Sequence, residues 1–455
     1  MRYFPHTESD IREMLGRLGL SDLSELFRSI PEKLAPEQKL NLPKALSEPE
    51  LLAEMQRLAA SNEYEDYLSF IGAGYYSHYT PAAVDSILQR SEFYTAYTPY
   101  QPEMAQGTLQ SIFEFQTMVC QLLEMEVANA SMYDGASACA EAALMCKRIK
   151  RKRSKVLMAR SIHPEYRTVT ETYLSAFKDD IVEVAVASNG RLDIDDLKAK
   201  LEAGDAACLI VGSPNYFGVV EDLKTIEPLV HEAGALLVVT FSEALAYGML
   251  RGPGAFGADI VCGEGQSFLG CPSFGGPGIG LFATRQKLMR QMPGRLCGQT
   301  LDRRGKVGYV LTLSTREQHI RREKATSNIC SNQALCALAT TIFLALMGRK
   351  GINELACHNL SKAEYLRKRI AGLDGYEVAF DAPTFNEFTI KCERVNASEI
   401  IEELKVEKIL PGLELKARYP EYDSHLLINV TELHKEEELD MFIEKLDSVG
   451  KGGKQ

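Results

Sequence analysis

The sequence lacks the features that mark membrane, exported and disulfide-bonded proteins. No run reaches the roughly eighteen continuous apolar residues of a membrane span, and the segment Met1-Arg2-Tyr3-Phe4-Pro5-His6 has no apolar stretch of the kind found in export signals. The eleven cysteines include no C-x-x-C pair. An odd number of scattered cysteines without an export signal is typical of reduced thiols. We therefore expect a cytoplasmic protein.

Basic residues are also fewer than acidic ones, 51 against 62. The formal net charge is -11 and the pI is about 5.4, which argues against a nucleic-acid or anionic-membrane partner because both favour a positive surface. The one dense basic run, residues 147–153, ends a helical pattern, where the helix dipole favours cations. Cys357 and His358 point in different directions on a helix, so we expect no metal site. The composition, 45% apolar and 25% charged, is typical of a soluble globular protein.

What the sequence does contain is an alternation of short apolar runs with helix-length periodic segments. The runs have strand length and are residues 156–159, 181–186, 208–211, 236–239, 259–262 and 279–282. Such continuous runs are typical of strands covered on both faces. Helical patterns between them, for instance Asp193 to Leu201 and Glu221 to His231, predict an α/β domain with a mainly parallel sheet.

The pattern changes along the chain and predicts three parts. Residues 1–62 have an amphipathic helical pattern interrupted by prolines, which predicts an N-terminal helical arm. Residues 63–328 hold the α/β pattern, with a glycine- and tyrosine-rich loop at 71–81. A long apolar helix from Gln333 to Met347, followed by weaker strands such as 388–390, predicts a small α+β domain over residues 329–455.

Two glycine-containing loops have the composition of anion sites. Gly135, Ala136 and Ser137 begin a helical run, so their backbone N–H groups converge at a helix N-terminus, an arrangement that binds anions. A serine N-cap after a glycine turn is also common without such a role. The second loop, residues 275–278, can equally be a turn into the next strand.

The order of these features resembles the large domain of the aspartate-aminotransferase-like enzymes, the pyridoxal-phosphate-dependent transferases of fold type I. The resemblance implies a mainly parallel seven-stranded sheet and a small C-terminal α+β domain. It also implies three groups around the cofactor: a lysine for the Schiff base, an aspartate opposite the pyridinium nitrogen, and an aromatic or histidine ring stacked on it. His163 matches the stacking position, although a loop histidine before a helix is an equal alternative.

The other two groups are absent. Thr240 stands where the resemblance places the aspartate, and Gln266 and Ser267 stand where it places the lysine. No lysine occurs between Lys224 and Lys287. Neither threonine nor serine forms an imine or balances a pyridinium charge. We therefore expect that this chain does not bind pyridoxal phosphate covalently.

Longer motifs narrow the resemblance. Residues 97–107 and 315–330 are similar to the glycine cleavage system P-protein, as are the segment 292–295 and the turn 213–218. The similarity is strong from about residue 65 to 345. In that family either one long chain with two homologous halves or two separate subunits form the enzyme, and only the second half or subunit carries the lysine. A chain with Ser267 at that position looks like the first, alpha-type subunit.

The function that this resemblance implies is that of an oxidoreductase of glycine catabolism, glycine dehydrogenase (aminomethyl-transferring, decarboxylating). Activity is expected only in a heterodimer with subunit 2, the lysine-bearing homologue, and pyridoxal phosphate is expected on that partner. Glycine is decarboxylated, and its aminomethyl group passes to the lipoyl arm of the H-protein. The T- and L-proteins complete the system.

The resemblance assigns this chain the subunit interface or the channel for the lipoyl arm. The candidate residues are Tyr97, Thr98, Tyr100, Gln101, Gln106, Arg321, Lys324, Thr326 and Asn328. The candidates for a residual cofactor-like pocket are Gly135, Ala136, Ser137, His163 and Gln266. The polar residues can also simply cap helices and join domains. Two other hypotheses stay open: a vestigial structural or regulatory pseudoenzyme, and a self-sufficient enzyme that uses Lys324.

Overall fold

The computed structural model describes residues 6–34, 41–176, 181–270 and 276–452. The chain forms two compact units, Met1–Tyr64 and Glu65–Gln455. The first contains the helices α1 (Glu8–Arg17) and α2 (Glu48–Ala59). A capping box begins α1, in which Thr7 and Asp10 each accept the other's backbone N–H.

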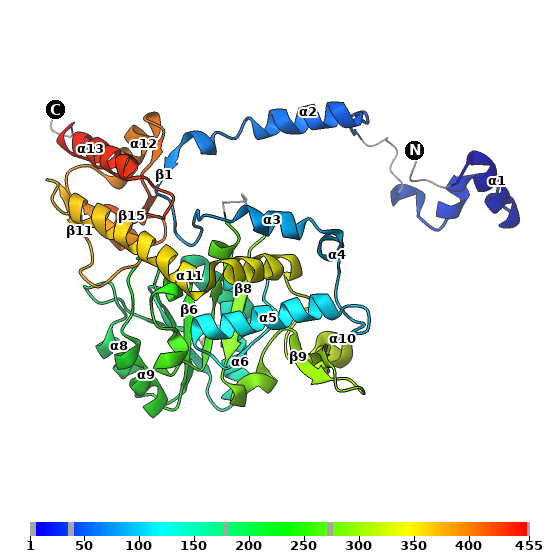
Figure 1. The fold of residues 1–455 in the computed structure, drawn as a ribbon, viewed down its shortest axis with the longest axis horizontal. Coiled ribbons are helices and arrows are strands. Elements are labelled where there is room, and N and C mark those ends of the chain that lie inside the picture. The colour runs from blue at the N-terminus through cyan, green and yellow to red at the C-terminus, as the bar shows by residue number, and fades with distance from the viewer. Residues whose placement is uncertain (1–5, 35–40, 177–180, 271–275, 453–455) are drawn as a thin grey trace. The chain divides into compact units, whose positions relative to one another are not determined.

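The centre of the second unit is a sheet of seven strands (Figure 1). In spatial order the strands are β2 (Val127–Ala128), β8 (Gly280–Thr284), β7 (Ile260–Glu264), β6 (Leu236–Phe241), β5 (Ala206–Gly212), β3 (Lys155–Ala159) and β4 (Ile181–Val184). Strand β8 runs antiparallel to both of its neighbours, β2 and β7, and the other adjacent strands pair in parallel. Every residue of β5, β6, β7 and β8 is buried, as expected for strands covered on both faces. The predicted mainly parallel seven-stranded sheet is confirmed.

Helices flank this sheet and supply the rest of the main core. They are α3 (Ala82–Leu88), α5 (Gln106–Leu123), α6 (Gly135–Ile149), α7 (Pro164–Tyr173), α8 (Ile194–Leu201) and α9 (Leu223–Glu232). Helix α6 packs on β5, β6, β7 and β8, and its small residues from Ala138 to Ala143 are fully buried against them. Its last turn carries Lys147 and Arg148, so the start of the basic run lies at a helix C-terminus as predicted.

A second, antiparallel sheet forms the C-terminal part. Its order is β11 (Tyr376–Val378), β12 (Glu387–Cys392), β15 (His425–Asn429) and β14 (Leu413–Glu414). Helices α12 (Ala397–Val406) and α13 (Glu436–Gly452) contribute to its separate hydrophobic core. The short strand β1 (Leu68–Ser69) pairs in parallel with β13 (Ile409–Leu410), so the chain enters the second unit beside this C-terminal part.

Helix α11 (Ala334–Ile370) joins the two cores. Its first half, from Ala337 to Ala356, packs into the core of the large sheet, and Ala363, Leu366 and Ile370 pack into the core of the small sheet. Gly348 interrupts the helix with φ 58° and ψ 179°, a conformation that favours glycine. By length and apolar composition α11 can span a membrane, but this packing and the kink are those of a core helix. The division at residues 328 and 329 stays a prediction, because one helix serves both cores.

Sequence patterns did not predict the hairpin of β9 (Leu296–Leu301) and β10 (Val307–Thr312). It is followed by the short helix α10 (Gln318–Arg321), and α4 (Ser91–Tyr94) precedes the 97–107 segment. The predicted loop at 71–81 is confirmed as irregular up to Pro81, the N-cap of α3. Of the predicted turn at 275–278, Gly275 lies outside the described residues.

The sheet brings several of the predicted pocket residues to one edge. Thr240 ends β6, Gln266 and Ser267 follow β7, and His163 follows β3. Because β3, β6 and β7 are parallel, their carboxyl ends meet at the same side of the sheet, where α/β proteins place their ligands.

Candidate interface surface and cofactor-like pocket

Arg295 joins three of the sequence motifs in space. Its guanidinium donates to Thr98 Oγ1 at 3.2 Å and to Tyr100 Oη at 3.3 Å, and it lies 5.4 Å from the centre of the Tyr100 ring. Its Nε is 3.6 Å from Glu317 Oε2, and both side chains are buried. His319 lies edge-on to the Tyr100 ring. The segments 97–107, 292–295 and 315–330 therefore form one contiguous region.

Several large apolar side chains of this region are exposed. Tyr97 is 77% exposed, Tyr100 is 54% exposed and Met104 is 85% exposed. Ile320, next to His319, is also exposed. We call the four residues Tyr97, Tyr100, Met104 and Ile320 the aromatic surface, after its two tyrosines. Clustered exposed apolar side chains of this kind mark interaction sites.

The polar candidates around the aromatic surface differ in what they do. Gln106, the first residue of α5, connects this helix to the β9–β10 hairpin. Its side chain accepts the N–H of Tyr309 in β10 and donates to the carbonyl of the same residue. Arg321 donates to the carbonyl of Thr315, so it also stabilises its own segment. The other candidates divide by exposure: Gln101, Lys324 and Asn328 are exposed, and Thr98 and Thr326 are partly buried.

The pocket begins at the N-terminus of α6, where Asp134 is the N-cap and accepts the N–H of Ser137 at 2.7 Å. Gly135 donates its N–H to Glu264 Oε2 at 2.9 Å. The other oxygen of Glu264 accepts the N–H of Ile279 at 2.8 Å. Burial raises the pKa of Glu264 to about 7, and the backbone donors oppose that rise. Two carboxyl groups thus already occupy this helix end.

Gly135 cannot be replaced without displacing a neighbour. A Cβ there would lie 1.9 Å from the hydroxyl of Tyr166 and 2.7 Å from the backbone nitrogen of Glu264. The Tyr166 hydroxyl donates to the carbonyl of Phe241, so it is held in place. The phenol therefore fills the space directly above the first turn of α6.

Gln266 and His163 both contact the loop that precedes α3. The Gln266 amide accepts the N–H of Tyr76 and donates to the carbonyls of Tyr76 and Gly270. His163 Nε2 is 2.8 Å from the carbonyl oxygen of Ala73. Tyr216 of the 213–218 turn packs edge-on to the imidazole, with ring centres 5.0 Å apart. Burial lowers the pKa of His163.

Ser267, at the position of the family's lysine, donates to Glu243 Oε1 at 2.6 Å. The other oxygen of Glu243 is 3.0 Å from His78 Nε2 and accepts from Asn386 at 2.9 Å. On its other side His78 lies 2.9 Å from Glu432. Both carboxyl oxygens of Glu243, the first acidic residue after β6, therefore already contact side chains of the same chain.

Thr240, at the position of the family's aspartate, is buried and carries no charge to balance a pyridinium. Its hydroxyl lies beside the thiols of Cys139 and Cys262. The sequence patterns did not predict Glu243, Glu264 or His78 as pocket residues. For Glu264 a signal existed, since a carboxylate between two glycines directly after an apolar strand is unusual.

Glu387 lies beside this pocket and makes stability depend on pH. Its carboxyl accepts from Ala73 N–H at 2.6 Å and from the Tyr76 hydroxyl at 3.0 Å. Burial raises its pKa from 4.5 to about 8. The folded chain then keeps a proton that the unfolded chain has lost, so this group's contribution to stability falls as pH rises from 4.5 through 8.

We expect Glu387→Gln, which mimics the protonated acid, to remove this part of the pH dependence. Between pH 7 and 8 the free energy of unfolding of the wild type should fall more steeply than that of the variant, by up to about 1 kcal/mol per pH unit. Urea unfolding at several pH values measures both slopes, and contributions from other groups cancel in the comparison. Parallel curves would show that Glu387 does not titrate in this range.

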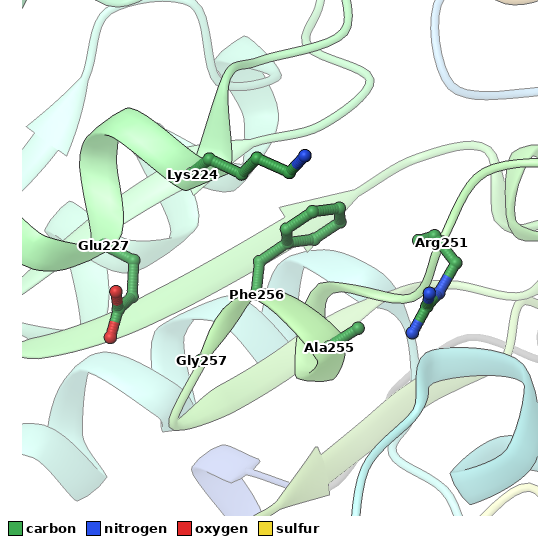
Figure 2. A pocket seen from close by; sticks show the side chains of 6 residues that line it. All are labelled: Lys224, Glu227, Arg251, Ala255, Phe256 and Gly257. Carbon is green, nitrogen blue, oxygen red and sulfur yellow. The ribbon is translucent and has the colours of Figure 1, made fainter.

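A pocket elsewhere in the second unit shares none of these residues. It is lined by Lys224, Glu227, Arg251, Ala255, Phe256 and Gly257. Figure 2 shows Phe256 lying between the side chains of Lys224 and Arg251. Because none of the sequence-predicted site residues lines it, it does not contribute to the candidate site.

Comparison with known proteins identifies the family. The family model described as the glycine cleavage system P-protein matches residues 1–446. The chain belongs to the P-protein family. Two relatives of this P-protein are named "Probable glycine dehydrogenase (decarboxylating) subunit 1". That of Brevibacillus brevis is 50% identical over 98% of this chain and 99% of the relative. That of Desulfotalea psychrophila is 49% identical over 98% of each chain.

Solved structures agree with this assignment. A crystal structure of glycine decarboxylase (P-protein) of the glycine cleavage system, in inhibitor-bound form, is 39% identical, with a TM-score of 0.90 over 99% of this chain and 100% of that one. A sphingosine-1-phosphate lyase of Burkholderia pseudomallei is 16% identical with a TM-score of 0.65, and this more distant likeness concerns the fold alone. The fold of this P-protein chain is that of the pyridoxal-phosphate-dependent enzymes of fold type I, as the sequence predicted.

The residues of this chain do not fit the cofactor of that fold. The α6 N-terminus is occupied by Asp134 and Glu264, the hydroxyl of Ser267 is bonded to Glu243, and Thr240 provides no counter-charge.

Proposed function

We propose that this chain is the subunit of a two-subunit glycine dehydrogenase (decarboxylating) that does not carry the cofactor, and that a lysine-bearing subunit 2 binds pyridoxal phosphate. The observation that supports the proposal is Ser267, which stands at the position of the Schiff-base lysine. Its side chain is buried and donates a hydrogen bond to Glu243. The subunit 1 names of the relatives support a partner subunit. Bound to that partner, pyridoxal phosphate supplies the electron sink that lets carbon dioxide leave glycine.

This chain's contribution is the aromatic surface and the polar residues around it. We propose that it covers the partner's active site, excludes water from it and forms one wall of the path for the lipoyl arm of the H-protein. Tyr100 is suited to this role because Arg295 holds its ring and hydroxyl in place from below. A preorganised side chain orients a ligand without the cost of ordering itself. The T- and L-proteins of the system, and a cytoplasmic location, belong to the same proposal.

Tyr97→Ser and Asn328→Ala test this role, since both side chains are exposed. We expect each variant to unfold like the wild type, and to lower glycine decarboxylation by the reconstituted two-subunit enzyme by about tenfold or more. Tyr173→Ser is the matched control, because Tyr173 is an exposed tyrosine on α7, outside the aromatic surface.

The same assay separates the alternatives. Unchanged turnover in both Tyr97→Ser and Asn328→Ala would favour a structural or regulatory chain with a vestigial pocket. A fall of equal size in the Tyr173→Ser control would point to general damage rather than to an interface.

A further inference from the structure

The N-terminus of α6 already holds a carboxyl group, and that group is a side chain of the same chain. Glu264 receives backbone N–H groups on both carboxyl oxygens, from Gly135 at 2.9 Å and from Ile279 at 2.8 Å. These bonds, at the positive end of a helix, are those that an external phosphate or carboxylate would receive there. Asp134 accepts the N–H of Ser137, in the same first turn. A further anion would meet two carboxyl groups, and the N–H groups of Gly135, Ser137 and Ile279 are already bonded to them.

The loop Gly72–His78 packs against His163 and Gln266, two of the residues predicted for the pocket. A Cβ on Gly74 would lie 2.8 Å from His163 Nε2 and 3.5 Å from Ser242 Cβ, so this glycine touches the imidazole and the end of β6 at once. The backbone of Tyr76 is held by the amide of Gln266 on both its N–H and its carbonyl. The loop therefore fills the space between His163 and Gln266.

Contacts of Ala73, Tyr76 and His78 with acidic side chains anchor the loop in this position. The N–H of Ala73 and the hydroxyl of Tyr76 both donate to Glu387. His78, which is fully buried, lies between Glu243 and Glu432. Tyr76 is only 1% exposed. The bonds of His78 to two carboxylates are charge-assisted and stronger than those between neutral groups, so they fix this end of the loop in the core.

We propose that the cofactor-like pocket of this chain is filled from within: the Glu264 carboxylate takes the place of a phosphate, and the loop Gly72–His78 takes the place of the ring. The pocket is then a structural core that binds no pyridoxal 5′-phosphate, covalently or otherwise. This proposal goes beyond the absent lysine, because restoring a lysine by Ser267→Lys would not create a cofactor site. It concerns this chain alone and does not rest on the partner subunit.

The first test removes the internal anion. Glu264→Ala deletes a methylene and a carboxylate, and acetate consists of the same heavy atoms. We expect the variant to have a lower urea midpoint than the wild type, and about 0.1 M sodium acetate to restore about half of the loss relative to the same concentration of chloride. Glu264→Gln is the control: its amide still fills the space, so its midpoint should not respond to acetate.

If Glu264→Ala does not accumulate as folded protein, its refolding yield in acetate against chloride measures the same rescue. An equal response of the wild type, Glu264→Gln and Glu264→Ala to acetate would overturn the role of Glu264. A urea midpoint of Glu264→Ala equal to that of the wild type would overturn it as well.

The second test examines the ring position, with pyridoxine 5′-phosphate as the probe because it has no aldehyde to react with surface lysines. Equilibrium dialysis should find no saturable binding up to about 1 mM to the wild-type chain or to Glu264→Ala, even though the latter accepts acetate. Binding of one equivalent by the wild type would overturn the whole proposal. Binding by Glu264→Ala alone would overturn the part that concerns the loop.

Discussion

Replacing His78 by glutamine should lower the free energy of unfolding by about 3–5 kcal/mol, the usual cost of removing one member of a buried ion pair. The imidazole is fully buried, with one nitrogen 3.0 Å from Glu243 and the other 2.9 Å from Glu432. An amide cannot supply the positive charge that these two carboxylates require. Equilibrium urea unfolding of the two proteins measures the difference.

The pKa values explain why the expected effect is large. Burial by itself lowers the pKa of His78, but Glu243 and Glu432 outweigh it and raise the pKa to about 10. Burial likewise raises the pKa of Glu432, but His78 outweighs it and lowers the pKa to about 2. The histidine therefore contributes its full stability below its ordinary value of 6.5 and loses it as pH rises through 10.

Two further variants isolate the charge effect at His78. His434→Gln is the matched control, because His434 is also buried but bonds only to backbone and to Thr431, and we expect it to cost about 1 kcal/mol. Adding Glu432→Gln to His78→Gln should recover part of the loss, since it removes one unpaired buried carboxylate. Equal losses for His78→Gln and His434→Gln would contradict a charged His78.

The second large effect concerns catalysis. Glycine-dependent exchange of carbon dioxide should stay at background with this chain alone and rise by about 10⁶-fold or more when the lysine-bearing subunit is added. The reason is that decarboxylation needs an electron sink, and the buried side chains of this chain leave no place for one. Titrating one subunit against a fixed amount of the other measures this dependence. Full activity of the second subunit alone would contradict a catalytic role for this chain.

Much of the fold was predictable because its signals are local. Each of the six apolar runs became a strand, with ends at most two residues from those predicted, since strands covered on both faces are apolar along most of their length. The seventh strand, β2, has only two residues and no pattern to detect. The hairpin strands β9 and β10 are largely exposed or half-buried, so they do not show the apolar run on which the prediction relied.

The candidate site was predictable only in part, because its contacts join distant residues. Gly135, His163, Gln266 and Ser267 follow strands or open a helix, and the sheet brings His163, Gln266 and Ser267 to one edge. Local sequence patterns could not predict which side chains fill the pocket. His78 and Glu432 are 354 positions apart, and Glu387 is 314 positions from Ala73. No helical or strand period links residues at such separations, so only the folded chain brings them together.

Reductive trapping tests most directly whether this chain lacks a cofactor site of its own. The purified chain is incubated with pyridoxal phosphate, reduced with borohydride and mapped by mass spectrometry, with the lysine-bearing subunit as positive control. We expect no visible aldimine absorption, no stoichiometric label on any lysine, including Lys324, and no release of carbon dioxide from glycine. One equivalent of label on a single lysine together with glycine decarboxylation by this chain alone would contradict this expectation.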